Sequence, residues 1–350
     1  MHSFLLLLIA INCLSCDQKP ESKQQPSQQQ VSIQQQAPLK AGRVISAVPV
    51  RGQAGQSYAF YLPASYDSSN TYPLLIALDP HGKGSLPLEK YKTLADTFNI
   101  VIAGSNYSKN GMNFKQSLAH IHLLIQDIGT RIRVDTARLW CMGFSGGARV
   151  ALNVGALNFG IDAVVLCGAG MPAEDTEEIS RLHFIGLAGD ADMNYPELYR
   201  LNKALNKQGG GNTLITFDGK HEWPPVEEMH SAFIWLQMDY YRRTGLNPPH
   251  TVLSKWIARD LSACDSIDNP ANRALRYERM IACYSGFTDV FGWKTKKQQI
   301  ERDPVTIAQR KRMAEIMLAE ERAEKNFSEA FIRADLNWWQ KQIARLRKTS

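Results

Sequence analysis

One stretch of the chain decides its fold: Arg138-Leu139-Trp140-Cys141-Met142-Gly143-Phe144-Ser145-Gly146-Gly147-Ala148-Arg149-Val150-Ala151-Leu152. Its first part is apolar and typical of a buried strand, and its last part is typical of a helix. Between them lies the pattern Gly-x-Ser-x-Gly, in which a sharp strand-to-helix turn exposes a serine hydroxyl. Glycine is needed on both sides because a side chain there would collide with the neighbouring strand or helix. The stretch therefore predicts a nucleophile at Ser145.

Two downstream segments can complete a catalytic serine, which needs a base to take its proton and an acid to orient that base. Asp190 and Asp192 come directly after an apolar, strand-like run, and His221 follows the next such run. From their order alone, either carboxylate can be the acid. Asp218, beside the histidine, is more typical of a turn. The sequence thus predicts Ser145 as nucleophile and His221 as base.

Short apolar runs alternate with helical stretches from about residue 44 to residue 243. This alternation is typical of a mostly parallel sheet covered by helices, so the fold class expected is α/β. The expected elements are strands at 58–63, 74–78, 100–103, 138–142, 163–167, 183–187 and 214–217, with helices near 114–132, 195–207 and 226–243.

These motifs resemble the α/β-hydrolase superfamily, in the branch of exported esterases similar to polyhydroxybutyrate depolymerases, feruloyl esterases and dienelactone-hydrolase-like proteins. The resemblance covers about residues 45–243 and is carried by Tyr61-Leu62-Pro63, Tyr72-Pro73-Leu74-Leu75-Ile76-Ala77-Leu78, His81-Gly82, the Gly143–Gly147 turn, Asp192 with Asn194-Tyr195, and His221-Glu222-Trp223-Pro224-Pro225. It implies an α/β-hydrolase fold and a catalytic triad of Ser145, Asp192 and His221. It favours Asp192 over Asp190 because in such relatives the acid stands shortly before an Asn-Tyr or similar pair.

The same resemblance implies an oxyanion hole built from two N–H donors. One is the backbone N–H of Gly146, directly after the nucleophile. The other is expected from the loop after the strand at 74–78, but the sequence inserts Asp79-Pro80 there. Three candidates for this second donor stay open: His81, Gly82 and Lys83.

Proteins that the chain resembles often carry a lid inserted between the strands that correspond here to 163–167 and 183–187. Only about fifteen residues, Gly168 to Leu182, separate these strands, so a large lid cannot be built. We expect an open site, which suits a small-molecule or polymer-borne ester that is polar or bulky better than a buried lipid.

Residues 1–16 predict a signal peptide of the bacterial lipoprotein type. The apolar run Phe4–Ile11 has the length of a signal-peptide core and is too short to span a bilayer. Leu14-Ser15-Cys16 resembles the end of a lipobox with Cys16 as the lipidated residue, although Cys13 and the lack of Lys or Arg before the run depart from that pattern. Residues 17–43 are Gln-rich and predict a disordered tether. We therefore expect an exported, membrane-anchored lipoprotein in the bacterial periplasm or at the cell surface.

The sequence divides into an expected catalytic domain at 44–245 and a helical C-terminal module at 251–350. The module holds 19 Lys and Arg against 13 Asp and Glu, which is the whole net charge of +6. We expect it to bind a protein partner or an anionic surface. Asn269-Pro270 and Asp303-Pro304 predict helix starts. An apolar helix face is expected from Ile316, Ala319, Ala323, Phe327, Ala330, Phe331, Trp338 and Ile343.

The cysteines beyond the N-terminal segment fall into two pairs. Cys141 and Cys167 lie in apolar strand-like runs and are expected to be buried thiols. Cys264 and Cys283 lie in the C-terminal module, and the sequence permits a disulfide bond between them without requiring one.

Composition and spacing exclude several classes of function. Residues 1–250 hold 21 Lys and Arg against 21 Asp and Glu, so the expected catalytic domain has no net field to attract nucleic acid. No His, Asp or Glu cluster has metal-ligand spacing, and neither a metal nor a cofactor is expected. The function expected is serine-dependent hydrolysis of carboxylic esters in the cell envelope. The alternatives are a noncatalytic envelope scaffold on the same fold, or a lipase or peptidase with the same triad.

Overall fold

The computed structural model describes residues 39–157, 160–171, 179, 182–207 and 212–349. The expected signal peptide, the acylation site Cys16, the tether as far as Pro38 and most of the Gly168–Leu182 segment lie outside the described residues. The chain from Leu39 onward forms one unit. Its first residues are already packed, because Leu39 and Ala41 contact the core and Gly42 N–H donates to the Leu62 carbonyl at 2.9 Å.

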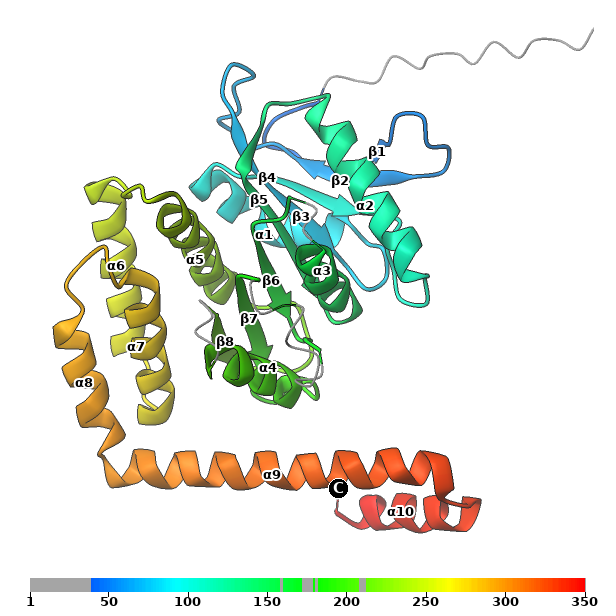
Figure 1. The fold of residues 1–350 in the computed structure, drawn as a ribbon, viewed down its shortest axis with the longest axis vertical. Helices are drawn as coiled ribbons and strands as arrows, with labels where there is room; N and C mark the ends of the chain where they lie inside the picture. Colours follow the sequence, from blue (N-terminus) through cyan, green and yellow to red (C-terminus); the bar gives the residue numbers. More distant parts are fainter. Residues whose placement is uncertain (1–38, 158–159, 172–178, 180–181, 208–211, 350) are drawn as a thin grey trace, which may run out of the picture. The chain divides into compact units, whose positions relative to one another are not determined.

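Within the described residues, eight strands form one sheet in the order β1-β2-β4-β3-β5-β6-β7-β8 (Figure 1). β1 and β2 run antiparallel to their neighbours, and the strands from β4 to β8 in this order are parallel. This arrangement confirms the predicted α/β class and is that of the α/β-hydrolase fold. The strands are β1 Ile45–Pro49, β2 Ser57–Tyr61, β3 Tyr72–Leu78, β4 Val101–Ser105, β5 Val134–Phe144, β6 Ala163–Cys167, β7 Phe184–Gly189 and β8 Thr213–Phe217.

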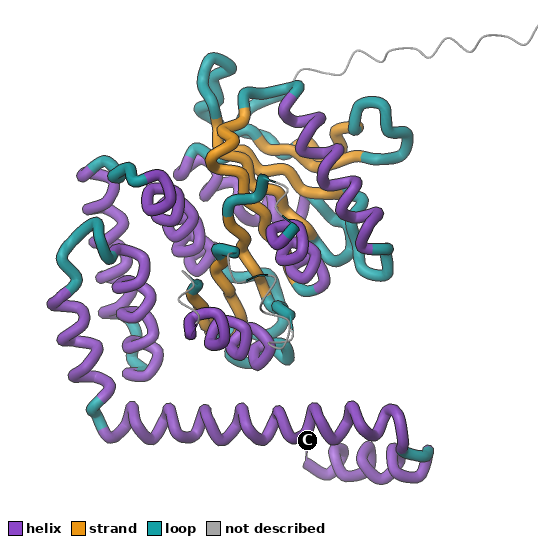
Figure 2. The backbone as a smooth tube through the Cα atoms, in the orientation of Figure 1, coloured by secondary structure: helices purple, strands orange, loops and turns teal. Residues whose placement is uncertain are grey.

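Helices cover both faces of this sheet, as the purple segments of Figure 2 show. One face packs against α1 (Ser85–Phe98) and α5 (Val226–Thr244), and the other against α2 (Phe114–Gly129), α3 (Gly146–Ala156) and α4 (Tyr195–Lys207). Because both faces are covered, β3, β4, β6 and β7 are buried along their whole length. This explains why the sequence shows continuous apolar runs there instead of alternation.

Five further helices follow α5, so the predicted helical character of the C-terminal region is confirmed for the described residues. They are α6 His250–Asp265, α7 Pro270–Tyr284, α8 Phe291–Glu301, α9 Pro304–Arg333 and α10 Leu336–Thr349. The predicted N-caps are present, since the Asn269 side chain accepts the N–H of Asn272 and that of Asp303 accepts the N–H of Val305.

The first of these helices share the core of the sheet instead of building their own. Leu253 of α6 and Met280 of α7 belong to the same buried cluster as α5. Trp256 stacks on Phe98 of α1 with ring centroids 6.0 Å apart. Cys264 and Cys283 are buried and free, like Cys141 and Cys167. A separate module at 251–350 remains a prediction, but α6 and α7 depend on contacts with α1 and α5.

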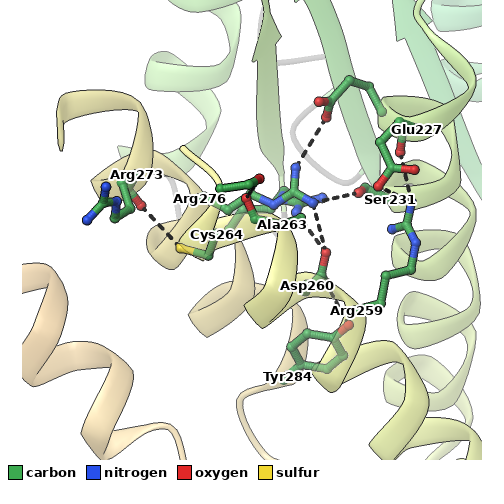
Figure 3. A network of polar contacts seen from close by, with 12 residues as sticks. Glu227, Ser231, Arg259, Asp260, Ala263, Cys264, Arg273, Arg276 and Tyr284 are labelled. Carbon is green, nitrogen blue, oxygen red and sulfur yellow. Dashed lines mark hydrogen bonds and ion pairs between the residues drawn. The ribbon is translucent and has the colours of Figure 1, made fainter. Parts of the chain in front are cut away.

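A buried ionic cluster joins α5, α6 and α7 (Figure 3). The Asp260 Oδ1 atom lies 3.2 Å from Arg276 Nη2 and 3.0 Å from Arg279 Nη2, and Tyr284 donates its hydroxyl to Oδ2 at 2.7 Å. Arg276 also reaches α5, where its Nη1 lies 3.3 Å from a Glu228 carboxylate oxygen. This cluster therefore links α6 and α7 to α5, which packs on the sheet.

The residues expected to form an apolar face lie on the last two helices, and most of the large ones are exposed. In α9 the buried residues are Thr306 and Ala330. Ile316, Phe331 and Ile343 are 44%, 79% and 48% exposed. The spacing was helical, but within the described residues this face is covered only in part, where Phe327 and Phe331 of α9 contact Trp339 of α10.

Candidate active site

Ser145 stands at the turn between β5 and α3. Its backbone has φ 54° and ψ −122°, a left-handed conformation that costs a non-glycine residue on the order of 1–3 kcal/mol. A Cβ on Gly143 would lie 2.2 Å from the Gly147 carbonyl oxygen, and a Cβ on Gly147 would lie 2.1 Å from that of Leu78. Both glycines are therefore required by packing. The N–H of Ser145 donates to the Cys167 carbonyl at 2.8 Å, which fixes the turn against β6.

His221 lies between Ser145 and Asp192. Its Nε2 atom is 2.9 Å from Ser145 Oγ, and its Nδ1 atom is 2.9 Å from Asp192 Oδ1. The neutral tautomer that fits carries its proton on Nδ1, donates to the carboxylate and accepts from the hydroxyl. Phe144 packs against the imidazole with ring centroids 4.7 Å apart. The structure thus brings the three residues within hydrogen-bond reach of one another.

Asp192 is the carboxylate that faces the histidine. Its side chain is fully buried, and Oδ1 also accepts the backbone N–H of Asn194 at 2.8 Å. Asp190 is exposed, and its Oδ1 atom accepts a backbone N–H of the loop after β8 at 3.3 Å. Asp218 is exposed as well. Of these three carboxylates, Asp192 is the one bonded to His221.

Gly168, which the sequence analysis did not single out as a site residue, makes room for this pair. It follows β6 with φ 62°. A Cβ there would lie 2.8 Å from Asp192 Oδ2 and 3.3 Å from His221 Nδ1. Asn194 Nδ2 donates to the Gly168 carbonyl at 2.9 Å and holds the turn in place. A glycine after an apolar strand is ordinary, so no sequence signal marks its closeness to the triad.

Hydrogen bonds to Asp79 and to side chains of α1 hold the loop that carries His221 in place. Trp223 Nε1 donates to Oδ2 of the buried Asp79 at 3.1 Å. On α1, Lys90 donates to the Trp223 carbonyl at 2.7 Å, and Tyr91 donates to the next carbonyl at 2.7 Å. The position of the imidazole therefore depends on α1 and on the end of β3.

The backbone N–H groups of the loop after β3 donate hydrogen bonds within that loop. His81 N–H donates to Asp79 Oδ1 at 2.9 Å, Lys83 N–H to the same atom at 3.3 Å, and Gly82 N–H to the Asp79 carbonyl at 3.0 Å. The His81 side chain is 73% exposed. In this conformation the three candidates for the second oxyanion donor are engaged with Asp79. Gly146, at the N-terminus of α3, stays the predicted donor next to the nucleophile.

Asn110 lies against Gly146, the residue after the nucleophile. A Cβ on Gly146 would come 1.8 Å from Asn110 Oδ1 and 3.3 Å from its Nδ2. The backbone N–H of Asn110 donates to the Pro80 carbonyl at 2.8 Å, which ties this loop to the loop after β3. A half-turn of the exposed amide exchanges its oxygen and nitrogen, so an N–H donor can face this spot. Asn110 lies in a stretch typical of any loop, so no sequence signal marks it.

The buried cysteines do not compete with Ser145 as nucleophiles. Burial raises the pKa of the Cys141 and Cys167 thiols well above their ordinary value, so both stay protonated. In the part of the chain that the structure describes, no three His, Cys, Asp or Glu side chains are grouped to hold a metal ion.

No protein-family model and no curated relative matches the sequence. Solved structures with a similar chain path include esterase B from Lactobacillus rhamnosis, at 16% identity over 58% of this chain and 90% of that one, with a TM-score of 0.47. A feruloyl esterase module from Clostridium thermocellum shares 12% identity over 61% and 93%, at 0.49. S-formylglutathione hydrolase from Staphylococcus aureus shares 12% over 55% and 98%, at 0.47. Likenesses this distant carry no argument about activity, so the fold rests on the strand order above.

Proposed function

We propose that this chain is a serine hydrolase that cleaves carboxylic esters through an acyl-enzyme. The observation that carries the proposal is the chain of hydrogen bonds from Ser145 through His221 to Asp192, with both distances 2.9 Å. A hydroxyl so placed can give its proton to the imidazole as it attacks, whereas an ordinary surface serine is inert. The strained backbone of Ser145 supports catalysis over a scaffold role, because a scaffold would gain nothing from that cost.

In the first half of the reaction, Ser145 Oγ attacks the ester carbonyl carbon and His221 Nε2 accepts the hydroxyl proton. The electron pair of the carbonyl moves onto its oxygen, where the Gly146 N–H stabilises the charge. Asp192 holds the imidazole in the productive tautomer and stabilises the imidazolium. When the tetrahedral intermediate collapses, the alcohol leaves with the proton from His221, and the acyl group stays on Ser145.

In the second half, water takes the place of the alcohol. His221 accepts a proton from the water, and the water oxygen attacks the acyl carbon. The bond to Ser145 Oγ then breaks, and the serine recovers its proton from the imidazolium. The products are a carboxylic acid and the free enzyme. Water is the only co-substrate that this scheme requires.

A polar or bulky ester is the substrate that we propose, in preference to a buried lipid. The described loops beside the triad carry exposed side chains, among them His81, Lys109, Asn110, Met193 and Lys220. A substrate with a large alcohol or acyl part can therefore extend away from Ser145. A lipase or peptidase would use the same triad, and a panel of acetyl, feruloyl and hydroxybutyryl esters against long-chain and amide substrates separates these activities.

The site of action is proposed to be the cell envelope. Support comes from the sequence of residues 1–16, which is typical of a bacterial lipoprotein signal with Cys16 as the lipidated residue. Among the described residues, the helices are all too short or too polar to cross a membrane.

Covalent labelling tests the proposed function directly. We expect a fluorophosphonate to add once to the mature chain, at Ser145, because an activated serine attacks the phosphorus and displaces fluoride. Intact mass and peptide mass spectrometry locate the adduct. Ser145→Ala should take up no label and should hydrolyse no p-nitrophenyl acetate above the uncatalysed rate. Equal labelling of the two proteins would rule out Ser145 as the nucleophile.

The amide of Asn110 is proposed as the second oxyanion donor. We expect Asn110→Ala to lower kcat by about 10²–10³-fold with little change in KM, the size found when one such donor is removed from a serine hydrolase. Asn110→Asp keeps the shape but offers an ionised acceptor to a developing anion, so its kcat should fall at least as far. Steady-state kinetics on p-nitrophenyl acetate measure both.

Lys109→Ala, at the neighbouring exposed position of the same loop, is the matched control and should keep the kcat of the wild type. A boronic acid that forms a tetrahedral adduct with Ser145 should bind Asn110→Ala more weakly by a similar factor. If Asn110→Ala keeps the wild-type kcat, the second donor is another group.

A further inference from the structure

We propose that the end of the α9–α10 hairpin docks on an anionic lipid surface. This hairpin end, residues 327–347, is formed where α10 folds back along α9. Asp335 starts α10 by accepting the N–H of Trp338 at 2.9 Å. Phe327 and Phe331 of α9 contact Trp339 with ring centroids 6.0 and 4.7 Å apart. These contacts define the fold of the hairpin end.

The hairpin end exposes large apolar side chains close together. The exposed fractions are 79% for Phe331, 84% for Ile332, 72% for Leu336, 48% for Ile343 and 60% for Leu346. Leu336, Ile343 and Leu346 follow helical spacing with Trp339, so they lie along one side of α10. Five large exposed apolar side chains within one hairpin end are more than the scatter of single exposed residues that needs no explanation, and they mark a candidate interaction site.

The groove between the two helices is both apolar and cationic. It has a volume of about 790 Å³. Its apolar lining includes Phe327, Trp338 and Leu346, and its charged lining is Glu329, Arg333 and Arg345. Such a lining suits an amphiphile with a hydrocarbon part and an anionic head, because guanidinium groups bind phosphate well.

The charge of the hairpin end favours a lipid surface over a protein partner. Residues 327–347 contain four Lys or Arg against Glu329 and Asp335, a net charge of 4 − 2 = +2. Arg333, Lys341 and Arg345 are exposed. Tryptophan and large aliphatic residues beside Lys and Arg are typical of helices that lie in a membrane interface, whereas the core of a protein interface is depleted in lysine. Each cation near an anionic bilayer strengthens binding about fivefold.

Vesicle binding tests this surface on the chain from Asp17 to Ser350, which lacks the predicted signal peptide and acylation site. We expect it to sediment with vesicles of phosphatidylglycerol and phosphatidylethanolamine, less so at high salt, and not with vesicles of phosphatidylcholine alone. Lys341→Gln/Arg345→Gln should bind the anionic vesicles about 30-fold more weakly. Phe331→Ser/Ile332→Ser should also bind more weakly, which separates insertion of apolar side chains from charge attraction alone.

Lys311→Gln/Arg312→Gln is the matched control, with the same charge change on exposed positions of α9. These positions lie about 30 Å along the helix from Ile332, well beyond the Debye length, so binding should stay close to that of the wild type. All variants should keep the thermal unfolding and the esterase activity of the wild type. Binding of Lys341→Gln/Arg345→Gln equal to that of the wild type, or a dimer that Phe331→Ser/Ile332→Ser abolishes while vesicles go unbound, overturns the proposal.

Discussion

Asp192→Asn is expected to lower kcat on p-nitrophenyl acetate by about 10⁴-fold while leaving the fold and KM little changed. The carboxylate accepts the Nδ1 proton of His221 at 2.9 Å and so keeps Nε2 free to take the proton of Ser145. An asparagine amide in the same place can donate to Nδ1, which moves the imidazole proton to Nε2. The histidine then faces Ser145 with a donor and cannot act as base.

Asp190→Asn is the matched control for this prediction, because the two residues lie in the same loop and the change is the same. Asp190 is exposed and accepts a backbone N–H at a long 3.3 Å, so its variant should keep a kcat near that of the wild type. Steady-state kinetics and circular dichroism of both variants make the comparison. A larger loss of kcat in Asp190→Asn than in Asp192→Asn would move the proposed acid to Asp190.

The triad could be predicted from the sequence because each member has a recognisable local sequence context. Ser145 needs Gly143 and Gly147 around it, since a Cβ at either would come within about 2.2 Å of a backbone oxygen. Asp192 and His221 each follow an apolar run, and carboxyl ends of parallel strands meet at one edge of a sheet. Sequence order alone did not separate Asp190 from Asp192, because burial and the bond to the imidazole depend on how two loops meet.

Asn110 and Gly168 could not be found in the same way. Their places beside the triad depend on contacts with Gly146 and with Asp192, made across the sheet edge by residues far apart in the chain. The resemblance implied a second oxyanion donor in the loop after β3 and not in the loop that holds Asn110. The buried carboxylate of Asp79, which accepts N–H groups of that loop and the indole N–H of Trp223, has no local sequence signal.

Two features of the helices are not determined by the sequence pattern: the presence of α1, and the exposure of the apolar face of α9 and α10. No helix was predicted at the place of α1. Pro87 lies near its start, and a proline in the first turn of a helix costs little since its N–H would have no partner there. The apolar spacing near the end of the chain did predict helices. Whether their apolar face is covered depends on which element reaches it, and spacing carries no information about that.

Asp260→Ala is expected to lower the free energy of unfolding by about 3–5 kcal/mol. The Asp260 carboxylate is the shared partner of Arg276 and Arg279, whose side chains are 8% and 6% exposed. Without it, two buried guanidinium groups face each other with Glu228 still paired to Arg276 but no carboxylate shared between them, and the hydroxyl of Tyr284 loses its acceptor. Because this cluster joins α6 and α7 to α5, the loss should loosen the whole face of the sheet that α1 and α5 cover.

The pH dependence of this contribution follows from the pKa of Asp260. Burial alone would raise that pKa, but the charges of Arg279 and Arg276 and the hydrogen bond from Tyr284 outweigh it and lower the pKa below 3.8. A carboxyl with a lowered pKa in the folded state contributes stability above its unfolded pKa and loses it as the pH falls through the folded value. The difference in unfolding free energy between wild type and Asp260→Ala should therefore shrink only below about pH 4.

Urea unfolding at neutral pH measures these differences, and Glu89→Ala is the control. Glu89 pairs with Lys92 at 2.8 Å, but both side chains are about half exposed, so its removal should cost at most about 1 kcal/mol. Asp260→Asn removes the charge and keeps the shape, and it provides a folded protein should Asp260→Ala not fold. If Asp260→Asn and Glu89→Ala lose equal stability, the cluster does not fasten α6 and α7. The tail helices would then be held by their other contacts with α1 and α5, which include the stacking of Trp256 on Phe98 and the hydrogen bond from Arg242 to the Cys283 carbonyl.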